Sequence, residues 1–434
     1  MAQDLIQRLV PDAPRALRQM LDGRRGAAEP PIRAEIFGPQ RFAQHGRSLG
    51  ETHRAALVGA RQAGFFPRLR GNIAVLREAH GYIGVQAATG YDISPAAEWL
   101  LDNFHLIEAQ LDEVRAGLPR RYFRALPVLL DKPLAGLPRV YGIAWAFVAH
   151  TDGAFDEELL VQFLGAYQES RELTLGELWG LPTTLRVVLI ENLRRLAERV
   201  ATHKAAREIA NRVCDQIERY ALVTLDALLA ALHRRGVGRV FLAQMAQRLQ
   251  DRSAPAYAAA STWQREWLAR ALPDLAALVG QQSADQAADN LSVSNAVSSL
   301  RDIGDADWPV IIARTSTLMR LMLSAPLFVA EATVTRDQTL HAIERLALAS
   351  DHTEVAVAQA LLERMHSAAQ TPGTAAEPAG SARPTSAQAL SSASAAVPAQ
   401  TTADHWLNGP GRPALAAALG LRERWHTVLH RRAR

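Results

Sequence analysis

Three polar residues in the first third of the chain are of types that acid–base chemistry and metal binding use. Asp102, His105 and Glu108 follow one another at intervals of three residues, and this spacing places them along one stripe of a helix. Carboxylates and imidazoles are zinc ligands, but one helix supplies too few of them for a complete site. We therefore interpret them as a polar stripe facing solvent or another helix, and keep a metal or acid–base site as the alternative.

A second polar group, His150, Thr151 and Asp152, directly follows the apolar run from Val140 to Ala149. Such residues could form the edge of an active site. However, a histidine at the carboxyl end of a helix interacts well with the helix dipole, and threonine and aspartate suit the turn that follows. The structural interpretation explains all three residues, so we favour it over a catalytic one.

The other motifs favour structure over cofactor binding. GVGRV, from Gly236, is too short for a phosphate-binding loop, and the sequence has neither an HExxH motif nor paired cysteines with zinc spacing. The single cysteine, Cys214, fits a reducing compartment and is expected to be a packed small side chain. In GFFPRLRGN, from Gly64, aromatic residues beside arginines could contact a nucleic acid or a sugar, but we expect Phe65 and Phe66 to pack.

Composition predicts that these residues are held by an all-α fold. The chain has 434 residues, of which 48% are apolar and 6% aromatic. It is rich in Ala, Leu and Arg, which favour helices, and comparatively poor in β-branched residues. The formal net charge of +4 is small, whereas nucleic-acid-binding proteins usually concentrate positive charge. Charge is concentrated only at the carboxyl end, in Arg422, Arg424, Arg431, Arg432 and Arg434.

Helical periodicity and capping residues define the expected elements, roughly ten to fifteen antiparallel helices in a bundle-like array. Ser94 and Pro95 predict the start of a helix that ends before Gly117. The apolar run 140–149 predicts a buried helix. Further helix starts are predicted at Asp156, at a Thr174–Glu177 capping box, at Asp307 and at Thr335. Residues 185–235 are expected to form two or more long helices, and residues 261–280 one more.

The chain divides into four predicted segments. Residues 1–50 are broken by prolines, 51–366 form a helical domain, 367–403 are an Ala/Ser/Thr/Pro-rich disordered linker, and 404–434 form a short basic helix. No run approaches the roughly 20 apolar residues of a membrane span, and no secretory signal is recognisable, so we expect a soluble chain that is not exported. The basic end, with Trp425, is either a solvated tail or a juxtamembrane segment.

Several long motifs resemble the N-terminal region of bacterial cyclic β-1,2-glucan synthases. They are AEWLLDNFHLIEAQLDEVRAGLPRRYFRALPVL, GLPRVYGIAWAFVAHTDGAFD, LTLGELWGLPTTLRVVLIENLRRLAERV and GRPALAAALG. RDQTLHAIERLALAS, followed by TEVAVAQALL, looks like the end of the same region. The resemblance extends roughly from Pro31 to Gly420, and its motifs stand in the family's order.

The resemblance implies a helical module that precedes a membrane-embedded family 84 glycosyltransferase. It implies a cytoplasmic location at the inner face of the bacterial inner membrane. The implied partners are the glycosyltransferase domain or subunit and the membrane surface, with no nucleic acid. UDP-glucose and a divalent metal are expected only for the transferase, and no cofactor for this chain. QREW, at Gln264–Trp267, departs from the family's QxxRW pattern and no catalytic aspartates precede RERW, so no catalytic residue is carried over.

Three hypotheses follow for the function. The leading one is a non-catalytic helical module, a fragment or split product, that packs against or positions the membrane glycosyltransferase. The first alternative is an independent carbohydrate-active enzyme, in which Asp102, Glu108, Asp152 and Glu177 are the weak catalytic candidates. Glycoside hydrolysis would require two of them to lie about 5–10 Å apart across a cleft. The second alternative is a helical adaptor unrelated to sugar.

Overall fold

The computed structural model describes residues 3–56, 64–90, 93–117, 119–250, 259–350, 352–370 and 399–421. This part of the chain is all-α, which confirms the prediction from composition. It contains 21 α-helices, three 3-10 helices and one sheet of two very short strands. The helices outnumber the ten to fifteen expected because turns divide several segments that the periodicity joins. They form two compact units, each of which is described by itself.

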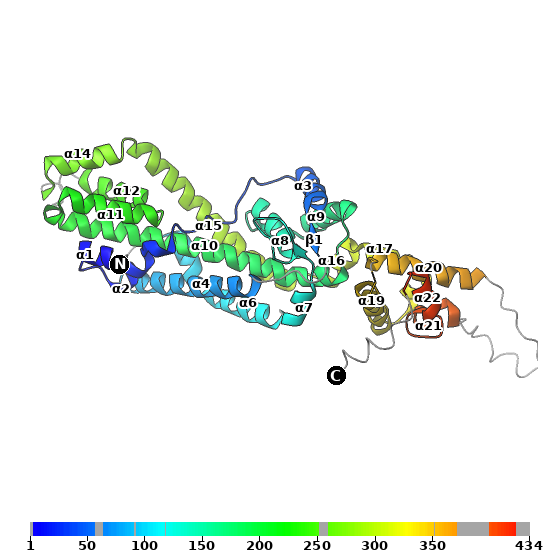
Figure 1. Cartoon of the computed structure of the whole chain (residues 1–434). Coiled ribbons are helices and arrows are strands. Elements are labelled where there is room, and N and C mark those ends of the chain that lie inside the picture. The colour runs from blue at the N-terminus through cyan, green and yellow to red at the C-terminus, as the bar shows by residue number, and fades with distance from the viewer. Residues whose placement is uncertain are drawn as a thin grey trace, which may run out of the picture. The chain divides into compact units, whose positions relative to one another are not determined.

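The first unit comprises residues 1–163 and 180–306. Its central helix is α10 (Leu175–Asp215), which supplies residues 180–215 and runs beside α4 (Phe65–Ala88) and α15 (Leu275–Asp305) (Figure 1). Its remaining helices are α1 (Gln3–Leu9), α2 (Arg15–Met20), η1 (Gly23–Arg25), α3 (Pro39–Thr52), α5 (Pro95–Asp102), α6 (Phe104–Ala116), α7 (Arg120–Ala125), α8 (Arg139–His150), the first half of α9 (Glu157–Ser170), η2 (Ile217–Arg219), α11 (Leu222–Arg234), α12 (Gly238–Gln250) and α14 (Thr262–Ala271).

The middle of α10 is buried on nearly every side. Leu185, Leu193, Ala201 and Ile209 have no exposed surface, although they lie on different faces of the helix. A helix that is buried all round must be surrounded by other helices. Helix α10 therefore lies in the core of the unit. The long segment 185–235 forms two helices, the later part of α10 and α11, in agreement with the prediction of two or more.

The apolar run 140–149 forms α8, and the prediction of a buried helix is confirmed, since within the run only Trp145 is partly exposed. Gly153 follows with a φ of 78°, in the left-handed region that glycine enters without a steric cost. The next helix, α9, begins as predicted: the Asp156 carboxylate accepts a hydrogen bond of 2.8 Å from the Leu159 amide. Such a cap satisfies one of the free N–H groups of the first turn.

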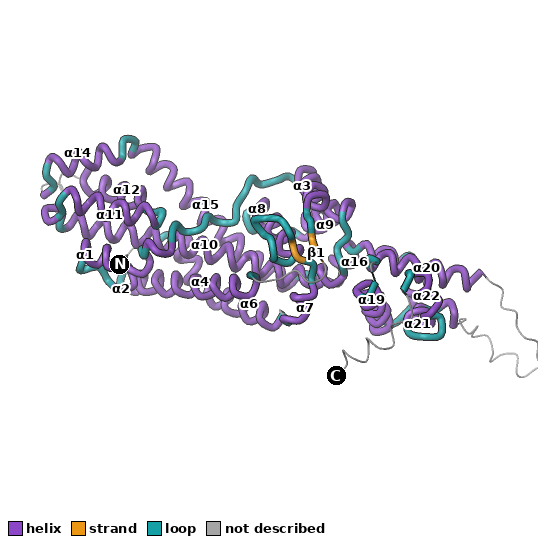
Figure 2. The backbone as a smooth tube through the Cα atoms, in the orientation of Figure 1, coloured by secondary structure: helices purple, strands orange, loops and turns teal. Residues whose placement is uncertain are grey.

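A minimal sheet pairs two segments of the chain that both precede α8. Strand β1 (Ala55–Ala56) runs antiparallel to β2 (Val128–Leu129), with Ala55 paired to Leu129 (Figure 2). A Cβ at Gly142 of α8 would lie 2.7 Å from a Leu129 methyl group. The glycine thus permits α8 to approach this sheet closely.

The helix predicted from Pro95 towards Gly117 is wrong in one respect, because it is divided at Asn103. Ser94 caps α5 as expected, accepting a hydrogen bond from the Ala97 amide, but the backbone of Asn103 leaves the helical conformation before α6. The Asn103 side chain donates 2.9 Å to the Trp99 carbonyl. Asparagine competes for backbone groups in this way and favours helix ends. The apolar residues Leu100, Ile107, Leu111 and Val114 recur at intervals of three to seven residues and are buried in spite of the break, whereas Phe104 is partly exposed.

The second unit comprises residues 164–179 and 307–434. In it, α20 (Glu354–Gln370) packs against α17 (Thr317–Leu323), α19 (Thr333–Leu348), α21 (Ala403–Leu407) and α22 (Arg412–Ala418). The other helices are α16 (Trp308–Thr315), α18 (Pro326–Ala330) and η3 (Ala399–Thr401). Met322, Ile343, Val357 and Leu361 have no exposed surface and form its core.

Three more helix predictions need correction. Residues 261–280 form two helices, because Pro273 lies between α14 and α15 and cannot donate a backbone hydrogen bond. Asp307 caps α16 as predicted, but that helix ends at Thr315, and Ser316 caps α17 through the Met319 amide. The helix predicted to start at Thr335 starts two residues earlier, at Thr333.

The carboxyl-terminal part of the chain is described only in part. Helix α20 continues to Gln370, so the first residues assigned to the linker 367–403 are helical, and residues 371–398 lie outside the described residues. Two short helices, α21 and α22, occupy the region where one was expected. The five arginines of the basic end, Arg422 to Arg434, also lie outside the described residues. Within the described ranges, no helix is long and apolar enough to span a membrane.

Candidate functional site

The first two predicted carboxylates lie on separate helices. Asp102 is exposed at the end of α5. Glu108 of α6 accepts 2.7 and 2.6 Å hydrogen bonds from the Arg77 guanidinium of α4, and this pairing is the main cause that lowers the pKa of Glu108. His105, the third member of the predicted stripe, is exposed. The three residues thus face solvent or a neighbouring helix, as the structural interpretation proposes, but the break at Asn103 means that they do not form one stripe on a single helix.

Asp152 is buried and occupies a turn with a φ of 50°. Non-glycine residues rarely adopt this conformation, and aspartate tolerates it better than most. The Asp152 carboxylate accepts hydrogen bonds from the Ser292 hydroxyl of α15 and, at 3.1 Å, from Arg33 Nε. Its backbone carbonyl accepts 3.2 Å from Asn295. Asp152 therefore connects the end of α8 to α15.

His150 and Thr151 make local contacts at the end of α8. The His150 ring lies 3.9 Å from the Phe37 ring in a stacked arrangement, and its Nδ1 is 2.7 Å from the Glu35 carbonyl. The Thr151 hydroxyl donates 3.0 Å to the Phe147 carbonyl one turn earlier. These contacts agree with the structural interpretation of the group.

Glu177, in the second unit, is fully buried in a helix cap. Its carboxylate accepts 3.0 Å from the Thr174 amide, and the Thr174 hydroxyl accepts 3.2 Å from the Glu177 amide. This reciprocal pair confirms the predicted capping box. Neither Glu177 nor Asp102, Glu108 or Asp152 lines the cavity described below.

Phe65 and Cys214 also have the structural roles expected of them. Phe65 is buried and stacks on Phe123, with ring centroids 5.6 Å apart. Cys214 is buried, and burial raises the pKa of its thiol to about 12. A thiol with so high a pKa is a poor nucleophile. Gln264, of the QREW segment, caps α14 together with Ser261.

Buried ionic groups, which the sequence reading does not single out, extend along α10. The Glu191 carboxylate accepts hydrogen bonds from Arg68 (2.5 and 2.9 Å), Asn72 (2.9 Å), Tyr141 (2.7 Å) and Arg195 (2.8 Å). Burial raises the pKa of Glu191, but these donors outweigh it and hold the pKa at about 2. A buried carboxylate with this many donors stays ionised.

A second buried pair lies one to two turns further along α10. Glu198 accepts 2.6 Å from Arg235 and 3.2 Å from Arg194. Arg235 is fully buried and also donates 3.0 Å to the Met20 carbonyl and 2.8 Å to the Gly26 carbonyl. These contacts fasten the amino-terminal segment and α11 to α10. The charges are thus used to join helices.

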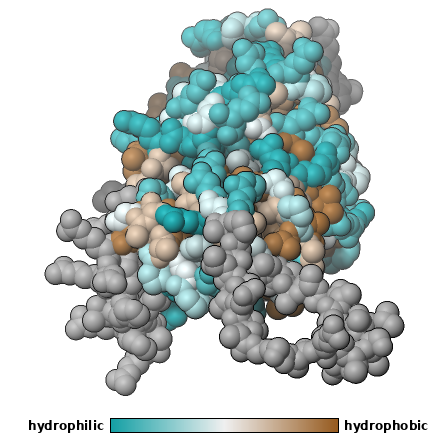
Figure 3. Space-filling model, turned by 90° about the vertical axis from the view of Figure 1, so that its right-hand side faces the viewer, coloured by the Kyte–Doolittle hydropathy of each residue, from teal (hydrophilic) through white to brown (hydrophobic). Residues whose placement is uncertain are grey.

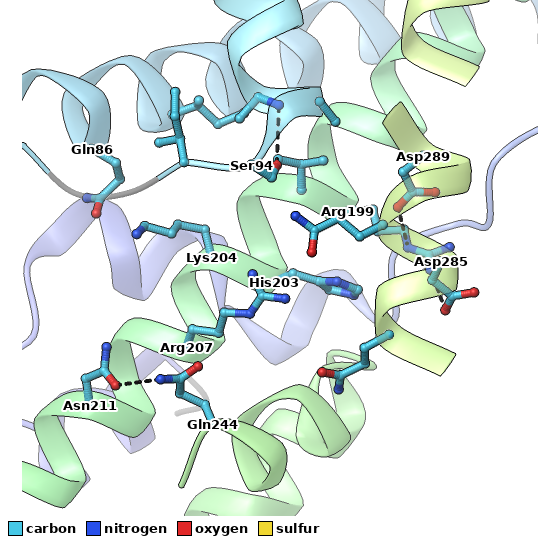
Figure 4. A pocket seen from close by; sticks show the side chains of 17 residues that line it. Gln86, Ser94, Arg199, His203, Lys204, Arg207, Asn211, Gln244, Asp285 and Asp289 are labelled. Carbon is cyan, nitrogen blue, oxygen red and sulfur yellow. Dashed lines mark hydrogen bonds and ion pairs between the residues drawn. The ribbon is translucent and has the colours of Figure 1, made fainter. Parts of the chain in front are cut away.

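Further along α10, the first unit encloses a polar cavity of about 370 Å³. Its lining comes from α4, α5, the residues before α5, α10, α12 and α15 (Figure 4). Arg199, His203, Arg207 and Asn211 of α10 recur every four residues, so one face of the helix lines it. The described residues of the lining with polar or charged side chains are Gln86, Ser94, Arg199, His203, Lys204, Arg207, Asn211, Gln244, Gln282, Asp285, Gln286 and Asp289.

The two carboxylates of the cavity are both paired with Arg199. This arginine lies 2.9 Å from Asp285 and 3.1 Å from Asp289. Burial, together with the nearby charges of Arg199 and Arg207, lowers the pKa of His203 to about 4, so this imidazole is neutral at pH 7. Among the described residues, no group of three or more His, Cys, Asp or Glu side chains could hold a metal ion.

The sequence contained one signal of this cavity. In the segment RVATHKAAREIAN, from Arg199 to Asn211, polar side chains recur at four-residue intervals, at Arg199, His203, Arg207 and Asn211. That spacing predicts a polar face. It does not reveal that Gln86 and Gln282, each about 80 to 120 residues away, complete the lining.

Comparison with known proteins identifies the relationship. No family model matches the chain. The cyclic β-(1,2)-glucan synthase NdvB of Rhizobium meliloti (strain 1021) is 34% identical over 346 residues, which is 78% of this chain. The chain covers only 12% of the length of that protein. The resemblance inferred from the motifs is therefore confirmed, and this chain matches one part of that cyclic β-1,2-glucan synthase.

Proposed function

We propose that this chain is a non-catalytic helical module of a cyclic β-1,2-glucan synthase system. The observation that supports this proposal best is the match to NdvB, which extends over most of this chain but only 12% of the synthase. A small part of a large synthase that is almost entirely helical is suited to holding another part in place. In this proposal, the module packs against a membrane glycosyltransferase domain or subunit.

The use of the charged side chains supports a non-catalytic role. A glycosidase needs two carboxylates facing each other across a cleft. Here Glu108 is paired with Arg77 on the surface, Asp152 connects two helices and Glu177 caps a third. These carboxylates are occupied by contacts within the fold, which argues against an independent carbohydrate-active enzyme.

Exposed apolar side chains offer a surface for packing. In the second unit Trp179, Val310, Val329, Val334 and Leu348 are each about half exposed or more. The face drawn in Figure 3 shows hydrophobic patches between hydrophilic residues. Apolar surface of this kind is stabilised when a partner covers it.

In this proposal the partner carries out the chemistry, and the module lies beside it at the membrane. UDP-glucose and a divalent metal would be bound by the glycosyltransferase, and the module would lie at the cytoplasmic face of the inner membrane. The arginines between Arg422 and Arg434 would face anionic lipid headgroups, because cytoplasmic flanks of membrane proteins are enriched in Arg and Lys.

A pull-down from the bacterium that makes the chain tests this proposal. The full chain, tagged, is captured from detergent-solubilised membranes, and the bound fraction is supplied with UDP-[14C]glucose. We expect labelled β-1,2-glucan from the bound fraction and none from the purified chain. The matched control is the double variant Val329→Asp, Val334→Asp, which is expected to capture at least about tenfold less activity.

Two outcomes would overturn the proposal. Turnover of UDP-glucose or of a glucan by the purified chain alone would instead establish an independent carbohydrate-active enzyme. Capture of partners without any glucosyl transfer would favour the adaptor unrelated to sugar.

A further inference from the structure

We propose that the polar cavity of the first unit, between α4, α5, α10, α12 and α15, binds a small phosphorylated sugar through Arg207 and Gln86. This inference does not depend on the proposed function. It assigns a ligand site to the module itself, away from any transferase. The cavity, at about 370 Å³, lies within the range of about 300–1,000 Å³ typical of small-molecule sites.

The positive charge of Arg207 is the first reason for the proposal. No described residue places an acceptor within hydrogen-bond or ion-pair distance of its guanidinium, and burial lowers its pKa. Arginine keeps its charge in proteins. The cavity carboxylates Asp285 and Asp289 are already paired with Arg199. A half-buried guanidinium without a counterion is costly, and an anionic ligand would offset that cost.

Unpaired amide groups are the second reason. Gln86 is only 7% exposed, and its Oε1 has no hydrogen-bond partner in the described structure. Gln282, of α15, also lines the cavity and has a buried Nε2 that likewise has none. Buried polar atoms are normally paired, so a ligand with both donors and acceptors would satisfy both groups. Hydroxyl groups provide both.

The remaining polar groups fit the same ligand. Gln244 Nε2 donates 3.0 Å to Asn211 Oδ1, which leaves the other amide atoms of this pair free for a hydroxylated ligand. Lys204 lies between Arg207 and Gln86 in Figure 4. An uncharged sugar would satisfy the amides but would leave Arg207 unpaired. Inorganic phosphate would pair with Arg207 but leave Gln86 and Gln282 unsatisfied. A sugar phosphate satisfies both sets of groups.

Isothermal titration calorimetry with the full chain tests the proposal. The probes are glucose 1-phosphate, glucose 6-phosphate, inorganic phosphate and glucose. We expect at least one sugar phosphate to bind more tightly than inorganic phosphate, and glucose to bind most weakly or not at all. The proposal is overturned if neither sugar phosphate binds, or if glucose binds as tightly as either.

Two variants and a control locate the site. Arg207→Gln is expected to lower the affinity for the sugar phosphate at least about tenfold without lowering Tm in the absence of ligand, because it removes an unpaired charge. Gln86→Leu is expected to weaken binding of the sugar phosphate more than binding of phosphate. The control is Arg212→Gln, on the same helix but paired with Glu208 and outside the cavity. Equal loss of affinity in this control, or undiminished binding by Arg207→Gln, would place the ligand elsewhere.

Discussion

Glu191 connects three helices through one side chain. Its donors Arg68 and Asn72 belong to α4, Tyr141 to α8, and Arg195 to the next turn of α10. An ionised carboxylate in this position is stable only while all of its donors stay in place, because the burial of a charge is compensated by hydrogen bonds and opposite charges. The packing of α4 and α8 on α10 therefore depends on this residue.

Replacement of Glu191 by Gln is expected to destabilise the chain by about 3–5 kcal/mol, since Arg68 and Arg195 lose their common counterion. Urea denaturation at pH 7 measures the change. The matched control is Glu108→Gln, which breaks an ion pair on the surface and should cost under about 1 kcal/mol. Similar losses in the two variants would show that burial of the Glu191 pair has no special effect on stability.

The two buried glutamates with shifted pKa values predict opposite pH dependences. The pKa of folded Glu191, about 2, lies below its ordinary value of 4.5. Its contribution is thus present above pH 4.5 and is lost as pH falls through about 2. Burial, together with the nearby charges of Glu344, Glu177 and Glu172, raises the pKa of Glu354 to about 7. The folded state then holds a proton that the unfolded state releases, so stability falls as pH rises from 4.5 through 7.

Glu354→Gln is expected to remove this second dependence. The variant keeps an oxygen that can accept the 2.8 Å hydrogen bond from the Leu175 amide and has no charge to bury. Its stability should therefore exceed that of the wild type by up to about 3 kcal/mol at pH 8 and differ little at pH 4. Thermal unfolding at both pH values measures the difference. A stability gain of equal size at both pH values would contradict it.

Close approaches between backbone segments decide several features at the scale of elements. At the turn between α21 and α22, the Gly409 amide donates 2.9 Å to the Asp404 carbonyl. A Cβ on Gly409 would lie 2.9 Å from the His405 carbonyl oxygen and 3.0 Å from its Cα. Backbone atoms cannot move aside as the end of a flexible side chain can. The two short helices therefore require a residue without a side chain here.

Gly409→Ala is expected to destabilise the second unit by about 1–3 kcal/mol, because the new methyl group displaces the turn. Its control is Gly165→Ala, in helix α9 of the same unit, where no atom lies within 4 Å of the added Cβ. That substitution should stabilise the helix by about 0.5–1 kcal/mol. The two Tm values measured by circular dichroism should thus change in opposite directions. If Gly409→Ala is neutral, the turn adjusts at no cost.

At the scale of the whole molecule, the chain consists of two compact units that are not contiguous in sequence, since residues 164–179 belong with residues 307–434. Each unit has its own buried core, with Leu185 and Leu193 in the first and Ile343 and Leu361 in the second. Separate cores permit separate cooperative unfolding.

We therefore expect two transitions in scanning calorimetry at pH 7. Glu191→Gln should lower the temperature of one transition and leave the other unchanged within about 1–2 °C, while Glu354→Gln should shift only the other. Each variant thus assigns one transition to one unit. A single transition that both variants shift would show that the units unfold together.

Sequence alone determined the features that depend on neighbouring residues. Composition and periodicity predicted the all-α fold, and short-range capping patterns predicted the helix starts at Asp156 and at Thr174 with Glu177. The buried helix α8 followed from an apolar run. These predictions succeed because a cap or an amphipathic face involves residues within one or two helical turns. The division at Asn103 was missed, because one asparagine is a weak signal within a strong apolar pattern.

Only the tertiary structure decided which charged and polar residues meet. Arg68 lies 123 residues from Glu191, and Ser292 lies 140 residues from Asp152. The side chains of Arg207 and Gln86 likewise share one cavity, although the sequence gives each no more than a place on a helix face. Such meetings depend on how helices from distant segments pack and rotate against one another, and a single sequence contains no local signal of this geometry.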